Sequence, residues 1–542
     1  MVIKLKITGM TCQHCAITVK KAIKTVKGVE KVEVYFPQNY AEVEGNFDID
    51  KVIEAVENAG YGASLLEENQ NVYISKNDRY DLVVLGGGSA GFAAAIRASD
   101  SGAKVLVVEN NIIGGTCLNR GCVPTKHLID VAKTYYIPKS NPFKGIELSQ
   151  GKIDIKTIIK EKDKLLDELR KEKYWNVLEA YPSIEYIEGK GEFLKDGVIK
   201  VNGKEFKYNK AVITTGSRPF IPPINGLLET EYMTNREILN IDYLPEHLIV
   251  IGGSAVGLEI GQIFLRFGSK VSVVEALPDI AYKEEPEIRE VLKKSLEKEC
   301  MKIYTSSKVL NVSQNGRIKK VLIEKDGEKI ELEGTDILVA TGRIANTDNI
   351  GLEKVGVETD KKGFIKTDEY MQTSNPDIYS AGDCVGKMML VTVAAVEGGI
   401  AGENALLGNK RKMDYSAIPH SIFTQPEIAS VGLTENQAKE KGINVEVRTL
   451  TFDKVPRAQA MKKTDGIIKI VAEEGTEKIL GVHICSLEAS DIIHKAVLIV
   501  KYGLTINDVI DSIDVYPTLS EAVKLCAQTF KKDVSRLSCC AQ

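Results

Sequence analysis

The chain has 542 residues, and its 71 basic and 75 acidic residues give a net charge of −4. At about 150 residues per domain this length predicts three or four domains, and the ordinary composition excludes a collagen-like, disordered or disulfide-scaffold chain. The balanced charge disfavours nucleic acid as a partner. No apolar run approaches ~18 residues, which predicts no membrane span. Lys4 and Lys6 make the N-terminus unlike a secretory signal, so we expect a cytoplasmic protein.

Residues 1–68 are predicted to form a separate βαββαβ unit. VIKLKITG alternates like a strand, and apolar residues at helical spacing follow from about Gln13 to Val26. KVEVYF and YAEVEG alternate as two further strands, and Asp48 is a predicted N-cap for a second helix that Gly60 ends. This order is that of a ferredoxin-like sandwich. Residues 69–78 are polar and unpatterned, which predicts a linker.

Six of the ten cysteines stand in three pairs, the first of which is Cys12 and Cys15 at the start of that first helix. Two soft thiolates at this spacing can bind a soft metal ion and leave room for a partner thiolate to take it over. A zinc site would need two further ligands, so it is the weaker interpretation, and a redox-active pair is a second alternative. The single cysteines are expected to be packing residues: Cys300, Cys384, Cys485 and Cys526.

The segment YDLVVLGGGSAGFAAAIRASDSGAKVLVVEN has the pattern of a dinucleotide-binding unit. Gly86, Gly88 and Gly91 follow an apolar strand, and Glu109 ends the next one. Glycines at these positions let the backbone approach a pyrophosphate at a helix N-terminus, and the acidic residue binds a ribose hydroxyl. The spacing therefore predicts one nucleotide site here.

A second segment, HLIVIGGSAVGLEIGQIFLRFGSKVSVVEAL, repeats the pattern. Gly252 and Gly257 frame its loop and Glu275 is its acid, but Ser254 stands where a middle glycine is usual. A serine still allows close approach, though less freely than glycine. Two such units in one chain predict FAD and a nicotinamide nucleotide as cofactors.

The second cysteine pair, Cys117 and Cys122, lies in GGTCLNRGCVPTK (114–126). This string resembles the redox-disulfide motif of the FAD-dependent pyridine nucleotide–disulfide oxidoreductases, and TTGSRP (214–219), ATGR (340–343) and IYSAGD (378–383) resemble further motifs of that family. The resemblance runs from about Tyr80 to the C-terminus and implies an α/β homodimer with two Rossmann-like domains. The implied parts are an FAD domain (79–224 and 346–415), an NAD(P)H domain (225–345) and an α+β dimerisation domain (416–542).

The resemblance also implies roles for individual residues. Cys117 is expected to face the substrate and Cys122 the flavin, and a helix N-terminus is expected to lower thiol pKa at the pair. Lys126 and Glu259 resemble the family's ion pair near the flavin, and Asp383 resembles the acid that binds the ribityl chain. Further cofactor contacts are implied at Thr116, Thr215, Gly216 and Gly342.

Three features resemble the mercury-reducing members of this family. GMTCQHC resembles the metal motif of a heavy-metal-associated domain, the chain ends with the adjacent pair Cys539 and Cys540, and Tyr516 stands where disulfide-reducing members have a catalytic His. Glu521, the usual partner of that His, is retained. Reducing a metal ion needs no proton delivered to a leaving thiol, so loss of the base fits. Tyr174 and Tyr516 are then implied to border the metal.

The implied reaction is reduction of Hg(II) to Hg(0) by NAD(P)H through FAD and the inner cysteine pair. Mercury would arrive as low-molecular-weight thiol complexes or from a mercury transport protein. It would pass by thiolate exchange from Cys12/Cys15 and Cys539/Cys540 to Cys117/Cys122, with the terminal pair reaching the other subunit's active site. Glu275 favours NADH because a carboxylate repels a 2′-phosphate, although the family more often uses NADPH.

Two alternatives remain. A dihydrolipoamide dehydrogenase or related disulfide reductase predicts a His before Pro517 and no terminal cysteine pair, and the sequence has neither feature. A non-catalytic metal chaperone fits residues 1–68 but leaves both dinucleotide segments without a purpose.

Overall fold

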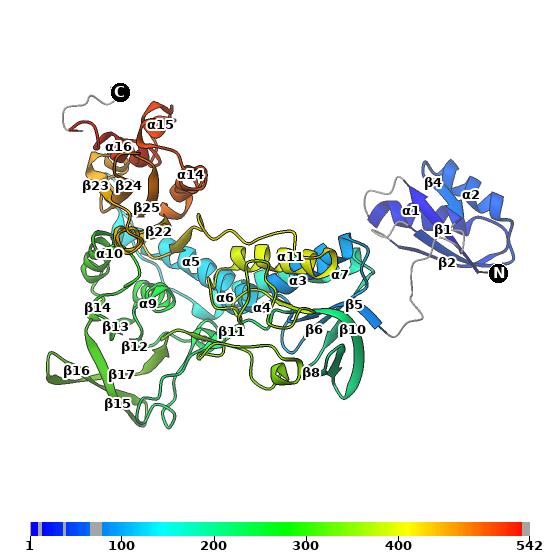
Figure 1. The fold of residues 1–542 in the computed structure, drawn as a ribbon, viewed down its shortest axis with the longest axis horizontal. Helices are drawn as coiled ribbons and strands as arrows, with labels where there is room; N and C mark the ends of the chain where they lie inside the picture. Colours follow the sequence, from blue (N-terminus) through cyan, green and yellow to red (C-terminus); the bar gives the residue numbers. More distant parts are fainter. Residues whose placement is uncertain (1, 9–12, 36–39, 66–78, 534–542) are drawn as a thin grey trace.

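The computed structural model describes residues 2–8, 13–35, 40–65 and 79–533, and Figure 1 shows their arrangement. The N-terminal unit is the predicted βαββαβ sandwich, with four antiparallel strands in the order β2-β3-β1-β4. Asp48 caps the second helix by accepting a hydrogen bond from Asp50 N at 3.1 Å, as predicted. The elements are β1 (Val2–Thr8), α1 (Gln13–Lys24), β2 (Val29–Tyr35), β3 (Tyr40–Gly45), α2 (Ile49–Asn58) and β4 (Gly62–Leu65).

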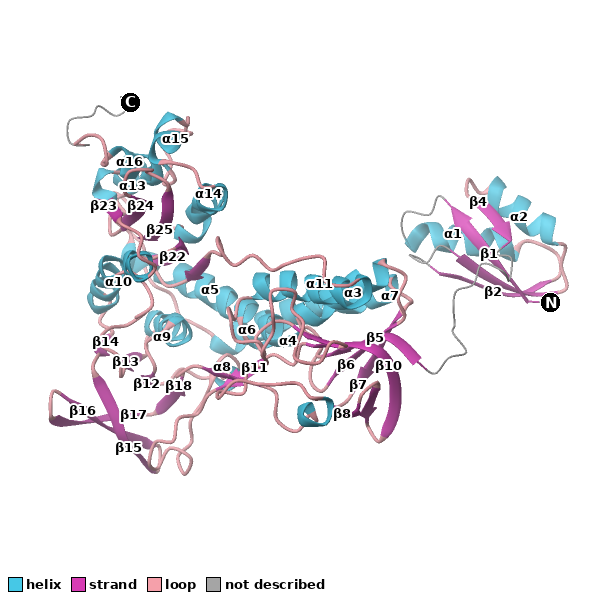
Figure 2. Ribbon diagram, in the orientation of Figure 1, coloured by secondary structure: helices cyan, strands magenta, loops and turns pink. Residues whose placement is uncertain are grey.

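The first α/β unit contains the first glycine loop. Its sheet has the order β7-β6-β5-β10-β9-β8, and β20 returns from much later in the chain to pair with β10. Helices α3 and α11 cover one face of this sheet (Figure 2). They pack so closely that a side chain on Gly398 of α11 has no room, because its Cβ would lie 2.1 Å from Ala90 O of α3. Two distant stretches therefore build one unit. Its elements include β5 (Arg79–Leu85), α3 (Ser89–Asp100), β6 (Val105–Glu109), β7 (Ile184–Glu188), β8 (Gly191–Lys195), β9 (Val198–Val201), β10 (Lys204–Ile213), β20 (Ile378–Ser380) and α11 (Val391–Leu407).

The second α/β unit contains the second glycine loop. Four parallel strands have the order β14-β13-β12-β18, and a three-stranded antiparallel sheet, β15-β16-β17, lies beside them. Strands buried on both faces explain the continuous apolar runs of the sequence. Its elements include β12 (His247–Ile251), α9 (Ala255–Phe267), β13 (Lys270–Val274), α10 (Pro286–Lys298), β14 (Lys302–Tyr304), β15 (Ser307–Asn315), β16 (Ile318–Lys325), β17 (Glu328–Gly334) and β18 (Asp336–Val339).

The C-terminal unit is an antiparallel sheet with helices, in the strand order β21-β22-β25-β24-β23. Apolar residues of the sheet pack against α14 and α16 in a core of its own. The elements include β21 (His420–Ile422), β22 (Glu427–Gly432), α12 (Glu435–Glu440), β23 (Val445–Thr451), β24 (Ile467–Glu473), β25 (Ile479–Ser486), α14 (Ala489–Tyr502), α15 (Ile506–Asp511) and α16 (Glu521–Gln528).

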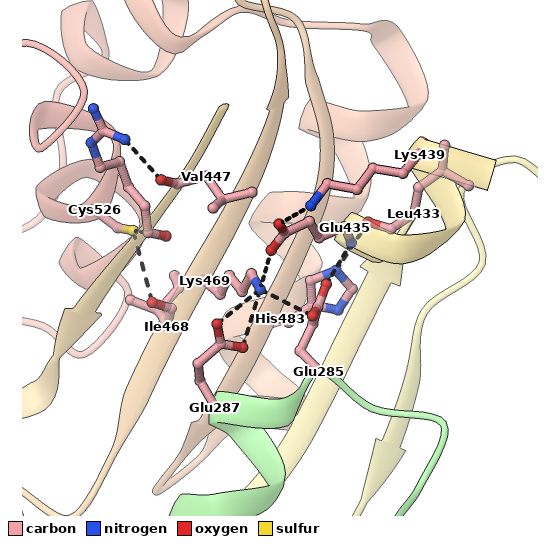
Figure 3. Close-up of polar contacts among 11 residues, drawn as sticks. Glu285, Glu287, Leu433, Glu435, Lys439, Val447, Ile468, Lys469, His483 and Cys526 are labelled. Atoms are coloured by element: carbon pink, nitrogen blue, oxygen red, sulfur yellow. Dashed lines mark hydrogen bonds and ion pairs between the residues drawn. The ribbon is translucent and has the colours of Figure 1, made fainter. Parts of the chain in front are cut away.

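A buried lysine joins the C-terminal unit to the second α/β unit (Figure 3). Lys469 Nζ, on β24, lies 3.0 Å from Glu285 Oε2, 2.8 Å from Glu435 Oε2 and 3.0 Å from Glu287 Oε1. Burial alone would lower the pKa of Lys469, but hydrogen bonds to the three carboxylates raise it above its ordinary value. Because Glu285 and Glu287 flank the start of α10, this cluster fixes the position of one unit on the other.

Candidate functional site

A pocket of about 330 Å³ lies between the first glycine loop, the 115–126 segment and the loop that follows β20. Cavities of this size hold cofactors and small ligands. The pocket brings together ten residues that the sequence assigned to cofactor binding or catalysis: Gly88, Glu109, Thr116, Cys117, Cys122, Lys126, Thr215, Gly216, Glu259 and Asp383.

The first glycine loop forms the cradle expected for a pyrophosphate. Gly86 has φ +122°, and a Cβ on Gly91 would lie 1.9 Å from Gly86 O, so the helix packs against the loop without room for a side chain. A Cβ on Gly115 would lie 2.8 Å from Gly88 Cα, so the two backbones pack directly against each other where both line the pocket. Glu109 Oε2 accepts a 2.7 Å hydrogen bond from Gly87 N. These residues fit a bound FAD.

The second loop has the same construction. Gly252 has φ +113°, and a Cβ on Gly257 would lie 2.0 Å from Gly252 O. Glu275 Oε2 accepts a 2.7 Å hydrogen bond from Gly253 N, as Glu109 does in the first loop. Ser254 has φ −104° and ψ −173°, an extended conformation that any residue adopts, so the departure from glycine costs no backbone strain. This loop fits a nicotinamide dinucleotide.

The two inner cysteines lie on either side of a helix break at Gly121. Cys117 is the third residue of α4 (Gly115–Arg120), and Cys122 is the first residue of α5 (Cys122–Ser140). A hydrogen bond from Cys117, with the nearby Lys126 ammonium, lowers the pKa of Cys122 to about 7, whereas donating that bond raises the pKa of Cys117. The prediction of a lowered thiol pKa at the pair is therefore wrong for Cys117, because one proton is shared between two sulfurs.

This asymmetry predicts the pH dependence of alkylation. In the reduced protein, iodoacetamide should modify Cys122 with a midpoint near pH 7, since its pKa is about 7 and only the thiolate reacts. Replacing Cys117 with Ala removes the hydrogen bond and should move the midpoint upward. Mass spectrometry of the labelled peptides measures both midpoints. Equal midpoints in the wild type and Cys117→Ala would contradict the assignment.

The predicted ion pair is present beside Cys122. Lys126 Nζ lies 2.8 Å from Glu259 Oε2, and Glu259 Oε1 accepts a 2.8 Å hydrogen bond from Phe423 N. Lys126 also lies 4.3 Å from the centroid of the Phe423 ring. Lys126 stands four residues after Cys122 on α5, so the two side chains share one face of the helix. The charge of Lys126 favours the Cys122 thiolate by lowering its pKa, and the carboxylate of Glu259 partly offsets this effect.

Two pocket residues that contact Asp383 were missed by the sequence analysis, although they lie in motifs it quoted. Arg343 Nε donates to Ser217 Oγ at 2.6 Å, and Ser217 Oγ donates to Asp383 Oδ2 at 2.5 Å. Burial lowers the pKa of Arg343, and Asp383, with its Oδ2 at 3.7 Å from Arg343 Nε, opposes that effect. Reading TTGSRP and ATGR residue by residue could have identified both.

The two predicted tyrosines lie in different places. Tyr174 belongs to a π-helical turn (Lys171–Trp175), its ring stacks edge-on against Phe92 at 4.7 Å, and its hydroxyl donates to Gly114 O at 3.4 Å, directly before α4. Burial raises the pKa of Tyr174. Tyr516 is 47% exposed on the C-terminal unit and does not line the pocket of its own chain.

The remaining predicted residues are not gathered at this pocket. Glu521 Oε2 accepts a 3.2 Å hydrogen bond from Thr518 N in the C-terminal unit, and Cys15 lies in α1. Cys12, Cys539 and Cys540 lie outside the described residues. Within the described part of the chain no cluster of three or more His, Cys, Asp or Glu side chains could hold a metal ion.

Three of the single cysteines are packing residues as expected, but one is not. Cys384, Cys485 and Cys526 are buried. Cys300 is exposed in the turn that follows α10, where its φ is +73°, two residues after the helix ends. The expectation was wrong for this residue.

Three family patterns match the chain. Residues 80–398 match the pyridine nucleotide-disulphide oxidoreductase family, residues 418–527 match its dimerisation domain, and residues 4–62 match the heavy-metal-associated domain. The chain belongs to the pyridine nucleotide-disulphide oxidoreductase family. None of the described helices is both long and apolar enough to cross a membrane.

Within that family the chain is similar over its whole length to mercuric reductases. It is 39% identical over 543 residues to the mercuric reductase of Lysinibacillus sphaericus and 40% identical over 542 residues to that of Staphylococcus aureus, and each alignment covers 99% of both proteins. Among solved structures it is similar to the HOCl-induced flavoprotein disulfide reductase RclA from Escherichia coli. That similarity has a TM-score of 0.75 and 28% identity, and covers 83% of this chain and 100% of the other.

Proposed function

We propose that this chain is a mercuric reductase, which uses NAD(P)H and FAD to reduce Hg(II) to Hg(0) in mercury detoxification. The observation that carries the proposal is the Cys117–Cys122 pair in the pocket beside the first glycine cradle, in a chain similar end to end to mercuric reductases. The overall reaction is NAD(P)H + Hg²⁺ → NAD(P)⁺ + H⁺ + Hg⁰, and it balances in charge and electrons.

FAD, when bound, supplies two-electron transfer between the nicotinamide and the thiol pair. The chain's own residues hold and prepare the reacting groups. Gly88 and Gly115 admit the pyrophosphate, and Glu109 presents its carboxylate at the ribose position. Lys126 stabilises the Cys122 thiolate, and the buried Glu259 keeps that ammonium in place.

The thiols bind mercury by exchange. A thiolate attacks a two-coordinate Hg(II)–thiol complex, one S–Hg bond forms as another breaks, and the departing thiolate takes up the proton that the incoming thiol released. The lower pKa of Cys122 keeps that sulfur as a thiolate, and Cys117 and Cys122 together complete the two-coordinate complex. Soft thiolate ligands favour Hg(II) over harder cations. The bound metal is then reduced in place.

The capture route is part of the same proposal. Cys12 and Cys15 of the N-terminal unit and Cys539 and Cys540 at the C-terminus take Hg(II) from low-molecular-weight thiols or a mercury transport protein in the cytoplasm. The terminal pair serves the partner subunit of a homodimer. The exposed position of Tyr516, away from its own chain's pocket, supports a site completed by the second subunit, with Tyr174 behind the Cys117 loop. A disulfide reductase is the second candidate, which the similarity to RclA favours.

The second glycine loop predicts a preference for NADH. Glu275 is fixed by its 2.7 Å hydrogen bond from Gly253 N, so its carboxylate lies where a ribose 2′-hydroxyl binds and a 2′-phosphate is repelled. We expect kcat/KM for NADH to exceed that for NADPH by about tenfold, or about 1.4 kcal/mol. Steady-state rates with the two nucleotides measure the ratio, and Glu275→Gln should reduce it. A large NADPH preference in the wild type would contradict this assignment.

A further inference from the structure

Two arginines line the flavin pocket without a carboxylate partner. Four cationic side chains line it, and two have acidic neighbours: Lys126 pairs with Glu259 at 2.8 Å, and Arg343 lies 3.7 Å from Asp383. The other two are Arg120 and Arg236. Within the ranges that the structure describes, no Asp or Glu carboxylate oxygen lies within 4 Å of a guanidinium nitrogen of Arg120 or Arg236.

The acids nearest to these arginines are committed elsewhere. Glu237 follows Arg236, but its Oε2 accepts hydrogen bonds from Thr234 N at 2.7 Å and Thr234 Oγ1 at 2.6 Å in a capping box. Glu109 attracts Arg120 at longer range, yet its oxygens accept hydrogen bonds from the backbone N–H groups of Gly87 and Asn111. The two arginines therefore have no carboxylate in direct contact, and only the longer-range attraction of Glu109 and Glu237 offsets their charge.

The two arginines reach the pocket from different parts of the chain. Arg120 stands four residues after Thr116 on α4, so both side chains share the helix face that lines the pocket. Arg236 lies on the short helix α8 (Asn235–Ile238), which precedes the second glycine loop. Asn235 Nδ2 donates to Arg120 O at 2.6 Å and ties the two segments together.

Besides burial, the closeness of Arg120, Arg236 and Arg343 lowers the pKa of Arg236. Burial lowers the pKa of Arg236, and the neighbouring charges of Arg120 and Arg343 lower it further. Like charges held together in a partly buried wall are unfavourable unless an anion joins them. Gly88 and Gly115 line the same pocket, and Gly88 is the N-cap of α3, so the start of that helix suits the most strongly anionic part of a dinucleotide.

We propose that Arg120 and Arg236 bind the pyrophosphate of FAD and close over it from two sides. The proposal rests on the proposed function, because it takes FAD as the cofactor. A guanidinium presents a planar fork of donors that matches phosphate oxygens, so each arginine can make charge-assisted hydrogen bonds there. The flavin would then tie α8, which leads to the nicotinamide loop, to the redox-cysteine segment.

The test measures flavin binding to apoprotein, by quenching of flavin fluorescence, for FAD and for riboflavin, which lacks phosphate. Arg120→Gln and Arg236→Gln should each weaken FAD binding by about tenfold, and the double variant by about a hundredfold, with riboflavin unaffected. Arg317→Gln, an exposed arginine in the turn between β15 and β16, is the matched control and should change neither ligand. Lysine at both positions should retain part of the FAD affinity.

Thermal unfolding of the apoproteins separates binding from a structural role. Removing crowded cations should leave the apoprotein at least as stable as the wild type while FAD affinity falls. FAD binding unchanged in the double variant, or FAD and riboflavin affinities that fall in the same proportion, would overturn the proposal. Wild-type apoprotein that binds neither flavin would instead overturn the cofactor assignment itself, and the role of the arginines with it.

Discussion

A Cys117→Ala/Cys122→Ala variant should keep its bound flavin and lose NAD(P)H-dependent Hg(II) reduction by at least about 10³-fold, which is about 4 kcal/mol of transition-state stabilisation. The pair supplies both the thiolates that hold the metal and the route by which electrons reach it. Neither cysteine side chain takes part in the close packing of Gly88 on Gly115 or in the hydrogen bond between Gly87 N and Glu109, so the expected FAD contacts stay in place. Flavin absorbance and mercury vapour release measure the two properties separately.

The matched control for this variant is Cys300→Ala. Cys300 is an exposed free thiol at the end of α10, so its loss removes a cysteine without touching the pocket. It should leave the rate of Hg(II) reduction within about twofold of the wild type, because surface substitutions away from a site change energies by only about 0.5 kcal/mol. If the Cys117→Ala/Cys122→Ala variant retained a tenth of the wild-type rate of Hg(II) reduction, the Cys117–Cys122 pair would have no part in the mechanism.

Lys469→Met should destabilise the protein by about 3–5 kcal/mol, because it leaves the buried carboxylate of Glu285 without its counter-charge. Lys469 and Glu285 have side-chain exposures of 1% and 2%, so water cannot replace the lost ammonium at Glu285. Glu287 and Glu435 would lose the same partner. The unfolding transition of the second α/β and C-terminal units in urea measures the loss.

Lys439→Met is the control for the lysine cluster. Lys439 pairs with Glu435 at 2.6 Å, but its side chain is 58% exposed, and an exposed pair contributes at most about 1 kcal/mol. If both variants unfolded at the same urea concentration, burial would not be what makes Lys469 important. A larger loss in Lys469→Met alone supports its role in joining the two units.

The sequence could predict what depends on local patterns. Gly86, Gly91 and Glu109 stand at fixed spacing from one strand, and the structure brings Glu109 back to the loop through Gly87 N. The βαββαβ order of residues 1–68 follows from alternation and one cap, Asp48. Each of these features lies within one strand–helix–strand unit or one small domain, and the predictions are confirmed by the strand order and by the hydrogen bonds.

Features that depend on contacts between distant segments were not predictable. Arg120 and Arg236 are 116 positions apart, and nothing in either segment shows that they line one wall. The opposite pKa shifts of Cys117 and Cys122 arise from the direction of one hydrogen bond, which spacing does not specify. Tyr516 remains a prediction, since its role requires a second subunit.

The central claim is that electrons from NAD(P)H reach Hg(II), and one anaerobic measurement tests it most directly. Purified protein is mixed with NAD(P)H, excess thiol and Hg(II), and nucleotide oxidation is followed together with elemental mercury vapour. We predict one Hg(0) released for each NAD(P)H oxidised, and no comparable oxidation when a disulfide such as lipoamide replaces mercury. Rapid turnover of the disulfide with no mercury vapour would contradict the account and favour a disulfide reductase.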